Sequence, residues 1–350
     1  MIYGGKSGEH EVSVASAASI IRHLDPDKYE AVPIKIEKSG RWALAAAAPT
    51  AISAADVLKD THAEALQPIE ATAVLGGGTL DVVFPVLHGP YGEDGTVQGL
   101  LELANVPYVG AGVLGSAVGM DKAVMKTMFA AAGLPIVPHI TVLRREWERD
   151  STGITVRVAS NLAYPVFVKP ANLGSSVGIS KAKSDTEFTA AMTLALQFDR
   201  KIVIEAGVAS AREIECAVLG NDDPVTSLPG EIVPSGEFYD YTAKYIDGSS
   251  TEIIPAILTD AQVREVRRLA VAAFQAVDGA GLSRVDFLLS RDTGALFLNE
   301  VNTMPGFTTI SMYPKMWEAS GLPYSTLLDR LIALALERHS EKQLLRTSIT

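Results

Sequence analysis

The chain has 350 residues, of which 47% are hydrophobic and 20% are charged. This balance is typical of a soluble globular protein with two or three domains and excludes wholesale disorder. The net charge of −11 argues against binding along a nucleic-acid backbone, and the single cysteine, Cys216, excludes a disulfide framework and a four-cysteine zinc site. No apolar run reaches a membrane span and residues 1–13 lack a signal-peptide pattern, so we expect a cytoplasmic protein that contacts no membrane.

The first part of the chain alternates helical and strand-like segments. The apolar patterns predict helices over 11–24 and 96–104 and strands over 29–36, 81–87 and 106–109. A polar loop, 88–95, follows the second of these strands. The alternation predicts a parallel sheet with a binding site at the carboxyl ends of its strands, in an α/β domain that ends near residue 110.

The remaining chain predicts a central domain, 111–204, and a C-terminal domain, 205–350. Predicted helices cover 121–132, 185–198, 260–277 and 324–338, and predicted strands cover 166–169, 178–182, 202–205, 213–219, 231–234, 283–289 and 295–301. Ser184 and Thr259 are the expected N-caps of two of these helices. The polar stretch 235–250 is long for a loop in a compact domain, so we interpret it as a candidate lid.

Gly4 and Gly5 indicate a tight turn into a helix N-terminus, which is suited to an anionic ligand. The run that follows lacks the earlier glycine of a phosphate-binding P-loop, and no strand is followed by a dinucleotide-binding glycine pattern. Glu11, in the first turn of the helix, either stabilises the helix dipole or binds a substrate ammonium.

Lys169 ends an apolar strand and is followed by a glycine- and serine-rich loop, 174–178. Backbone N–H groups and hydroxyls in such a loop suit phosphate oxygens, and the lysine supplies a point charge. The alternative is a flexible hairpin beside a lysine whose ammonium reaches solvent. The convergence of several donors favours phosphate binding.

Two neighbouring predicted strands carry the strongest polar constellation. Because side chains alternate along a strand, Arg284 and Asp286 share one face of the first strand, and Glu300 and Asn302 share one face of the second. Two carboxylates and an amide oxygen are hard ligands that suit Mg²⁺. The alternative is a structural ion pair between the arginine and either carboxylate.

Several further residues have a possible role in binding. The Pro305-Gly306 turn leads to Ser311 and could bring a backbone N–H near a reacting carbonyl. Glu205 and Glu213 could accept hydrogen bonds from an adenine amino group and from ribose hydroxyls, although exposed structural glutamates are the ordinary alternative.

Taken together, these segments resemble the D-alanine–D-alanine ligases of the ATP-grasp superfamily. The matching residues lie in family order along nearly the whole chain, at 4–5, 11–13, 88–89, 92–96, 120–122, 168–170, 174–178, 213–215, 239–241, 243–245, 284–286, 299–303 and 305–306. The resemblance implies an α/β ATP-grasp fold, with an N-terminal parallel α/β domain followed by central and C-terminal α+β domains and with nucleotide bound between them.

The resemblance also implies the residues that bind ATP, which are Lys122, Lys169, Ser176, Glu205, Ala206, Val208, Glu213, Lys244 and Asn299. The lysines would bind phosphates and the 174–178 loop would cover them. Many relatives carry a lysine where this chain has Ala206, so only a backbone contact is expected there. Asp286, Glu300 and Asn302 would hold two Mg²⁺ ions, with Mn²⁺ as a possible substitute.

The catalytic residues implied by the resemblance are Glu11, Ser175, Tyr245, Arg284 and Gly306. The first three would form a hydrogen-bonded set that closes the lid, with Glu11 on the ammonium of the first D-alanine. Arg284 and the Gly306 amide would stabilise an oxyanion. His88, Ser311 and Met312 would join Glu11 in binding substrate, the latter two at the carboxylate of the second D-alanine.

The resemblance therefore implies an enzyme that joins two D-alanines at the expense of ATP, through an acyl phosphate, for peptidoglycan precursor synthesis. A homodimer is also expected from it. One alternative is an ATP-grasp ligase with D-serine or D-lactate as second substrate. Another is a nucleotide-binding regulator without turnover, although the intact set of Lys169, Asp286, Glu300 and Asn302 argues against it.

Overall fold

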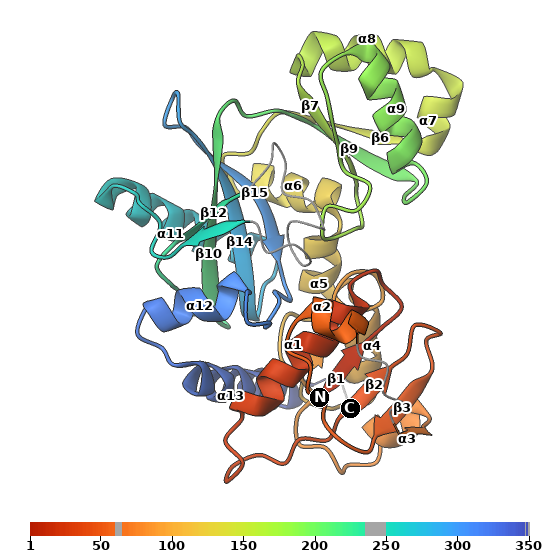
Figure 1. Cartoon of the computed structure of the whole chain (residues 1–350), viewed down its shortest axis with the longest axis vertical. Coiled ribbons are helices and arrows are strands. Elements are labelled where there is room, and N and C mark those ends of the chain that lie inside the picture. Colours follow the sequence, from red (N-terminus) through yellow and green to blue (C-terminus); the bar gives the residue numbers. More distant parts are fainter. Residues whose placement is uncertain (60–64, 235–249, 347, 349–350) are drawn as a thin grey trace.

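The structure is a computed structural model that describes residues 1–59, 65–234, 250–346 and 348. Three sheets follow one another along the longest axis of the molecule (Figure 1). The N-terminal sheet lies at one end, the sheet formed by strands β10–β15 lies in the middle, and the sheet formed by β6–β9 lies at the other end. Segments that are far apart in sequence therefore meet at the two junctions between sheets.

The N-terminal sheet has five strands in the order β4-β3-β2-β1-β5. Its strands are β1 (Ile2–Gly4), β2 (Ile34–Ile36), β3 (Trp42–Ala45), β4 (Leu66–Pro68) and β5 (Pro85–Val86). The predicted parallel pairing is confirmed for β1 with β2 and β5, whereas β3 and β4 add antiparallel edge strands. The accompanying helices are α1 (His10–His23), α2 (Ala54–Lys59), α3 (Ala71–Leu75) and α4 (Thr96–Leu103).

All three predicted strands of this domain are shorter than expected, and β2 covers only Ile34–Ile36 of the predicted 29–36. Only β5 forms within 81–87, and the segment 106–109 contributes a single parallel bridge between Val83 and Tyr108. Pro85 and Pro107 have no N–H to donate, so neither segment can continue a full ladder of hydrogen bonds. The two segments still run side by side, because the Val83 N–H donates to the Pro107 carbonyl at 2.8 Å and the Val109 N–H donates to the Val83 carbonyl at 2.9 Å.

The central sheet has four antiparallel strands in the order β6-β9-β7-β8. They are β6 (His139–Leu143), β7 (Val166–Pro170), β8 (Ser180–Ala182) and β9 (Lys201–Ala206), with helices α7 (Arg144–Arg149), α8 (Ser151–Leu162) and α9 (Asp185–Ala195). The predicted N-cap of α9 is confirmed, since the Ser184 hydroxyl accepts the Glu187 N–H at 3.3 Å. Helices α7 and α8 were not predicted.

The C-terminal sheet has six strands, with β13-β12-β10-β14-β15 in order and β11 paired to β10. They are β10 (Ala211–Gly220), β11 (Val225–Thr226), β12 (Gly230–Val233), β13 (Thr251–Ile253), β14 (Gly281–Ser290) and β15 (Leu296–Asn302), with helices α11 (Asp260–Ala276), α12 (Met312–Ala319) and α13 (Tyr324–Gln343). Thr259 caps α11 as predicted, through the Gln262 N–H.

Helices α5 (Val113–Met120) and α6 (Lys122–Ala131) connect the N-terminal domain to the rest of the chain. The Asp121 side chain caps α6 by accepting the N–H groups of Ala123 and Val124, both at 3.1 Å. The predicted boundary near residue 110 precedes α5, and the one after residue 204 falls inside β9; both boundaries remain predictions. Within the described residues, every helix is too short or too polar to cross a bilayer.

Candidate active site

Two adjoining cavities are lined by residues from all three parts of the chain. The larger, of about 420 Å³, lies among β7, β9, β10, β14 and β15. The smaller, of about 100 Å³, is lined by N-terminal loops, by the start of α6 and by the segment after β15. Both cavities are lined by Lys122, Leu173, Gly174, Ser175, Glu215, Arg284 and Glu300.

The larger cavity brings together most of the residues expected to bind nucleotide and metal. These are Lys122, Lys169, Ser176, Glu205, Ala206, Val208, Glu213, Asp286, Asn299 and Glu300. The lysine at the end of β7 therefore faces the acidic hairpin β14–β15, and the Lys169 Nζ donates to the Asn299 Oδ1 at 3.3 Å. The predicted phosphate site at Lys169 and the predicted Mg²⁺ site on the hairpin can serve one nucleotide only if they lie this close together.

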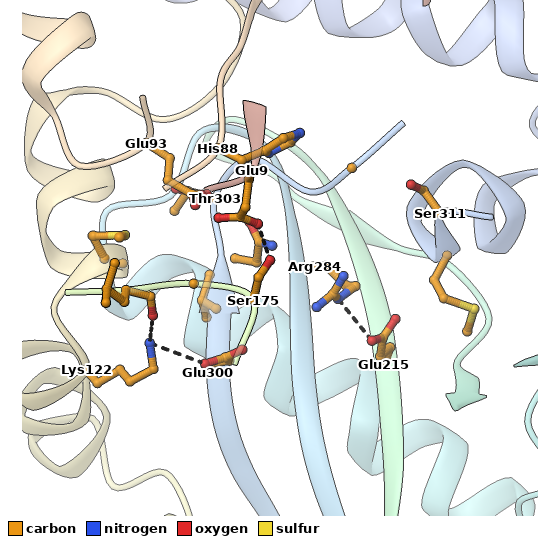
Figure 2. Close-up of a pocket in the computed structure, with 18 of the residues that line it drawn as sticks. Glu9, His88, Glu93, Lys122, Ser175, Glu215, Arg284, Glu300, Thr303 and Ser311 are labelled. Carbon is orange, nitrogen blue, oxygen red and sulfur yellow. Dashed lines mark hydrogen bonds and ion pairs between the residues drawn. The ribbon is translucent and has the colours of Figure 1, made fainter. Parts of the chain in front are cut away.

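The smaller cavity is lined by the other residues expected to bind substrate or to act in catalysis, as far as the structure describes them. Among the described ones, only Glu11 is missing from its lining. The cavity is lined by His88, Ser175, Arg284, Asn302, Gly306, Ser311 and Met312 (Figure 2). Lys244, Tyr245 and nearly all of the candidate lid 235–250 lie outside the described residues. Their assigned roles remain predictions.

The exception is Glu11, and the predicted hydrogen bond between Glu11 and Ser175 is wrong. The Ser175 hydroxyl donates to the carboxylate of Glu9, which lines the smaller cavity (Figure 2). Glu11 lies two residues further along and forms an ion pair with the Lys38 Nζ at 2.5 Å. Helix α1 begins at His10, so Glu9 precedes its first turn and projects toward the cavity, whereas Glu11 is held by the β2–β3 connection.

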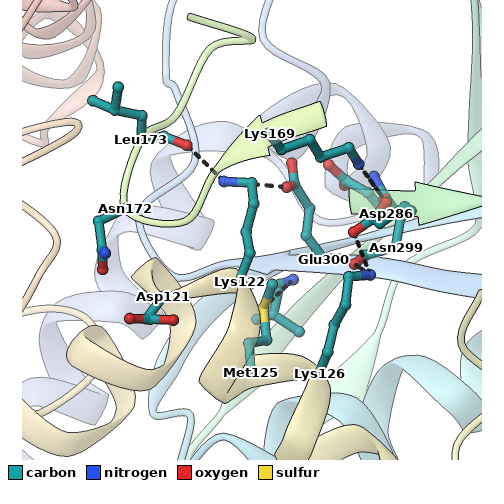
Figure 3. Close-up of polar contacts among 12 residues, drawn as sticks. Asp121, Lys122, Met125, Lys126, Lys169, Asn172, Leu173, Asp286, Asn299 and Glu300 are labelled. Carbon is teal, nitrogen blue, oxygen red and sulfur yellow. Dashed lines mark hydrogen bonds and ion pairs between the residues drawn. The ribbon is translucent and has the colours of Figure 1, made fainter. Parts of the chain in front are cut away.

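Two lysines provide positive charge where the cavities meet (Figure 3). Lys122, at the start of α6, donates to the Leu173 carbonyl at 2.6 Å and has its Nζ 3.9 Å from a Glu300 carboxylate oxygen. Burial alone would lower the pKa of Lys169, but the nearby carboxylates of Glu205 and Glu300 outweigh it and raise that pKa above its usual value. Lys169 is therefore positively charged at neutral pH although it is buried.

The carboxylate of Glu205 forms ion pairs with two lysines, Lys126 and Lys169. Its carboxylate oxygens lie 2.8 Å from the Lys126 Nζ and 2.7 Å from the Lys169 Nζ. Burial would raise the pKa of Glu205, but the two ammonium groups lower it to about 2. The role of this carboxylate as an acceptor for adenine remains a prediction, since each oxygen can accept a further hydrogen bond.

The glycine-rich loop after β7 has an unusual backbone. Ser175 and Ser176 adopt φ values of 49° and 60°, and Gly178 adopts 71°. Residues with side chains are uncommon in this left-handed region, and such strain concentrates at functional sites. The start of the loop is fixed by Asn172, whose backbone and side-chain nitrogens both donate to one Asp199 oxygen at 2.9 Å.

The expected metal ligands share one face of adjacent strands. Asp286 pairs directly with Glu300 across β14 and β15, and Arg284 pairs with Asn302. The alternative ion pair also forms, since the Arg284 Nε and Nη2 donate to the Asp286 Oδ1 and Oδ2, each at 2.7 Å. Among the described residues no three His, Cys, Asp or Glu side chains form a metal-binding group, so the set consists of two carboxylates and one amide. This oxygen-only set fits Mg²⁺, which takes a few protein ligands and completes its shell with water and phosphate.

The segment after β15 is tightly packed around Gly306. A Cβ added to Gly306 would lie 2.8 Å from the Ser311 Oγ. That hydroxyl accepts the Thr308 N–H at 2.9 Å, and the Phe307 N–H donates to the Ser16 Oγ of α1 at 3.1 Å. These contacts hold the segment that contains Gly306, which lines the smaller cavity together with Arg284.

Two buried titratable residues of the polar loop 88–95 line the smaller cavity, and only His88 was expected there. Glu93 accepts the Gly89 N–H at 2.7 Å, and burial together with the charge of Glu9 raises the pKa of Glu93 to about 8. His88 is buried and its Nδ1 lies 3.0 Å from the Met304 carbonyl; burial lowers the pKa of His88, so the ring is neutral. Glu93 could have been found from its place in the polar loop 88–95, which follows a predicted buried strand.

Comparisons with known proteins show the family to which the chain belongs. The family described as D-ala D-ala ligase N-terminus matches residues 1–111, and the family described as D-ala D-ala ligase C-terminus matches residues 128–333. A D-alanine–D-alanine ligase of Geobacillus thermodenitrificans (strain NG80-2) is 50% identical over 354 aligned positions, which cover 99% of this chain and 97% of the relative.

Two solved structures are similar over nearly the whole chain. The D-alanine–D-alanine ligase from Coxiella burnetii has a TM-score of 0.83 at 40% identity, with 98% of this chain and 96% of that chain covered. The VanG D-Ala:D-Ser ligase from Enterococcus faecalis has a TM-score of 0.82 at 35% identity, with 95% and 98% covered. The predicted α/β ATP-grasp fold is confirmed, and the chain belongs to the D-alanine–D-alanine ligase family.

Proposed function

We propose that this chain uses ATP to join two D-alanines into D-alanyl-D-alanine, through an acyl phosphate, for peptidoglycan precursor synthesis. Membership of the family supports the proposal. The observation that carries it is the position of Lys169 opposite Asp286 and Glu300 in a single cavity of about 420 Å³, next to a smaller cavity that shares Ser175 and Arg284 with it. A triphosphate and a small amino acid would occupy the two cavities.

The larger cavity is assigned to ATP. Lys122, Lys169 and the loop that contains Ser175 and Ser176 are the proposed phosphate ligands, because they combine fixed positive charge with backbone donors. Two Mg²⁺ ions, which Mn²⁺ could replace, would be held by Asp286, Glu300 and Asn302 and would neutralise phosphate charge. The base and ribose are assigned to the end that contains Ala206, Val208 and Glu213.

The smaller cavity is assigned to the two D-alanines. Glu9, in place of Glu11, is the proposed partner of the first ammonium, and its hydrogen bond with Ser175 fixes the carboxylate. The carboxylate of this D-alanine attacks the γ-phosphate, which gives an acyl phosphate and ADP. The amine of the second D-alanine then attacks the acyl carbon and expels phosphate.

Two groups are assigned to the second step. Arg284 and the Gly306 amide, which line the smaller cavity, are the proposed donors that stabilise the tetrahedral oxyanion. His88, Ser311 and Met312 line the same cavity and are the proposed contacts of the second substrate. Water would destroy the acyl phosphate, so closure of a lid is required, and 235–250 with Lys244 and Tyr245 is the segment we propose for it.

The second substrate is tested by product analysis. The chain is incubated with ATP and Mg²⁺, first with D-alanine alone and then with equal D-alanine and D-serine or D-lactate, and the products are identified by mass spectrometry. The proposal predicts D-alanyl-D-alanine as the main product in each mixture. A mixed dipeptide or a depsipeptide as the main product would favour the alternative ligases. The homodimer and the cytoplasmic location remain predictions.

A further inference from the structure

The cluster around Lys169 contains a second lysine to which the reaction described above gives no role. Lys126 lies on α6, one turn after Lys122, and only 1% of its side chain is exposed. Its Nζ is 2.8 Å from the Glu205 Oε1 and donates to the Asn299 carbonyl at 3.2 Å. Figure 3 shows the side chains of Lys122 and Lys126 rising from the same helix toward Asn299 and Glu300. A lysine is costly to bury, so its presence here requires a reason.

Glu205 connects this lysine to Lys169. The carboxylate lies between the two ammonium groups, with its second oxygen 2.7 Å from the Lys169 Nζ. Lys126 lowers the pKa of Glu205 together with Lys169, and burial lowers the pKa of Lys126 itself, an effect that Glu205 opposes. The three side chains form a buried row with two positive charges and one negative charge.

A short ion pair with Glu205 fixes the Lys169 ammonium in place, which is an advantage for a group that must meet a phosphate. The same carboxylate cancels the positive charge that the phosphate needs. A second buried cation on the other carboxylate oxygen removes this conflict, since the row then keeps a net charge of about +1 in a region of low dielectric constant. Lys169 can be held rigidly and still attract an anion.

We infer that Lys126 is a positioning residue for phosphate binding: it offsets the charge of Glu205, so that Lys169 is fixed by an ion pair and the row stays cationic toward the triphosphate. Lys126 does not line either cavity and is not placed in contact with the nucleotide. This inference rests on the proposed function, because it takes the larger cavity as the ATP site.

The inference is tested by binding of ATP, ADP and adenosine in the presence of Mg²⁺, measured by isothermal titration calorimetry. Lys126→Met is expected to weaken the binding of ATP by about tenfold or more. A loss of this size is typical when one member of a charged network is removed. Adenosine carries no phosphate, so its affinity is expected to change by less than about twofold. Lys126→Arg keeps the charge and is expected to retain more of the ATP affinity than Lys126→Met.

The double variant Lys126→Met/Glu205→Gln gives the sharpest readout. It removes one positive and one negative charge, so the row again has a net charge of about +1. The buried carboxylate of Glu205 is then replaced by a neutral amide, so no buried negative charge is left partly unpaired. The ratio of ATP to adenosine affinity is expected to recover toward the wild-type ratio, and using the ratio cancels any loss of a contact with the base. A purely structural lysine would not be compensated in this way.

Lys201→Met is the matched control. Lys201 forms an ion pair with Asp121, the residue that caps α6, and it lines neither cavity. Circular dichroism melting curves identify a temperature at which every variant is folded. The control is expected to leave the ATP to adenosine ratio unchanged.

The outcomes separate the inference from the proposed function. If wild type does not prefer ATP to adenosine, or if Lys169→Met does not weaken ATP selectively, the assignment of the larger cavity fails and the inference fails with it. If both of those results hold but Lys126→Met weakens ATP and adenosine equally, the inference alone is overturned. It is likewise overturned if the double variant binds ATP no better than Lys126→Met.

Discussion

Ser175 in the glycine-rich loop donates its hydroxyl hydrogen to the carboxylate of Glu9, which directly precedes α1 and lies 166 residues earlier in the chain. A Cβ on the adjacent Gly174 would lie 3.0 Å from a Glu9 oxygen, so the loop and the N-terminal domain are in close contact at this point. The proposed phosphate-binding loop and the proposed site of the first D-alanine are thereby joined through one carboxylate.

Glu9→Gln is expected to lower kcat/KM for D-alanine by roughly 10- to 100-fold, because a hydrogen bond to a charged group contributes about 1.5–3 kcal/mol. The matched control is Glu11→Gln, which disrupts only the ion pair with Lys38 and is expected to change kcat/KM by less than about threefold. Steady-state kinetics with varied D-alanine measure both. A larger loss in the Glu11 variant would restore the role that the sequence first assigned to it.

Glu300→Gln is expected to reduce turnover by more than about 100-fold at ordinary Mg²⁺ concentrations, because it removes a charged ligand from a set of only two carboxylates and one amide. ADP release is measured over a range of Mg²⁺ concentrations, with the surface variant Glu265→Gln as control. Near-normal turnover of the Glu300 variant would remove the metal assignment.

Gly306→Ala is expected to lower kcat by roughly 10- to 100-fold and to leave the KM for ATP nearly unchanged. The new methyl group would meet the Ser311 Oγ at 2.8 Å, so either the Ser311 side chain or the Gly306 amide has to shift, and both are assigned to the second step. Gly99→Ala in α4 is the control, because a Cβ there meets nothing within 4 Å. That control is expected to keep full activity and to be slightly more stable. Unchanged kcat in the Gly306 variant would contradict the assignment.

Glu93 makes the stability of the ligand-free protein depend on pH. Its pKa is raised to about 8 in the fold, so between about pH 5 and pH 8 the native state binds a proton that the unfolded state has lost. This contribution is absent below the unfolded pKa and destabilises the fold increasingly as the pH rises, by up to ~1.4 kcal/mol per pH unit.

The matched variant is Glu93→Gln, which can still accept the Gly89 N–H through its amide oxygen. Urea unfolding at several pH values is expected to show that the variant gains stability relative to wild type between pH 5 and pH 8. A constant difference in the free energy of unfolding over this range would show that Glu93 titrates normally.

The arrangement of polar residues on the β14–β15 hairpin could be predicted because strand alternation is a local rule. Arg284 with Asp286 and Glu300 with Asn302 were expected on shared faces, and the register of β14 and β15 places each pair directly opposite the other. The capped helices α9 and α11 were predicted for the same reason, since a cap and an apolar repeat lie within a few residues of each other.

Other features depend on contacts between distant segments and could not be predicted. Glu9 and Glu11 lie within one helical turn, and only the position of Lys38 and of the 174–178 loop decides which of them faces the cavity. The row of Lys126, Glu205 and Lys169 joins three separate elements, so no spacing along the chain marks it. The i, i+4 repeat of Lys122 and Lys126 on α6 was the one local signal, and it equally fits a solvated helix face.

The central claim is tested most directly by measuring ADP and D-alanyl-D-alanine together in one reaction that contains ATP, Mg²⁺ and D-alanine as the sole amino acid. The proposed function predicts that ADP release requires D-alanine and that one dipeptide forms for each ADP. ADP release that does not depend on D-alanine, or that is not accompanied by dipeptide, would contradict it.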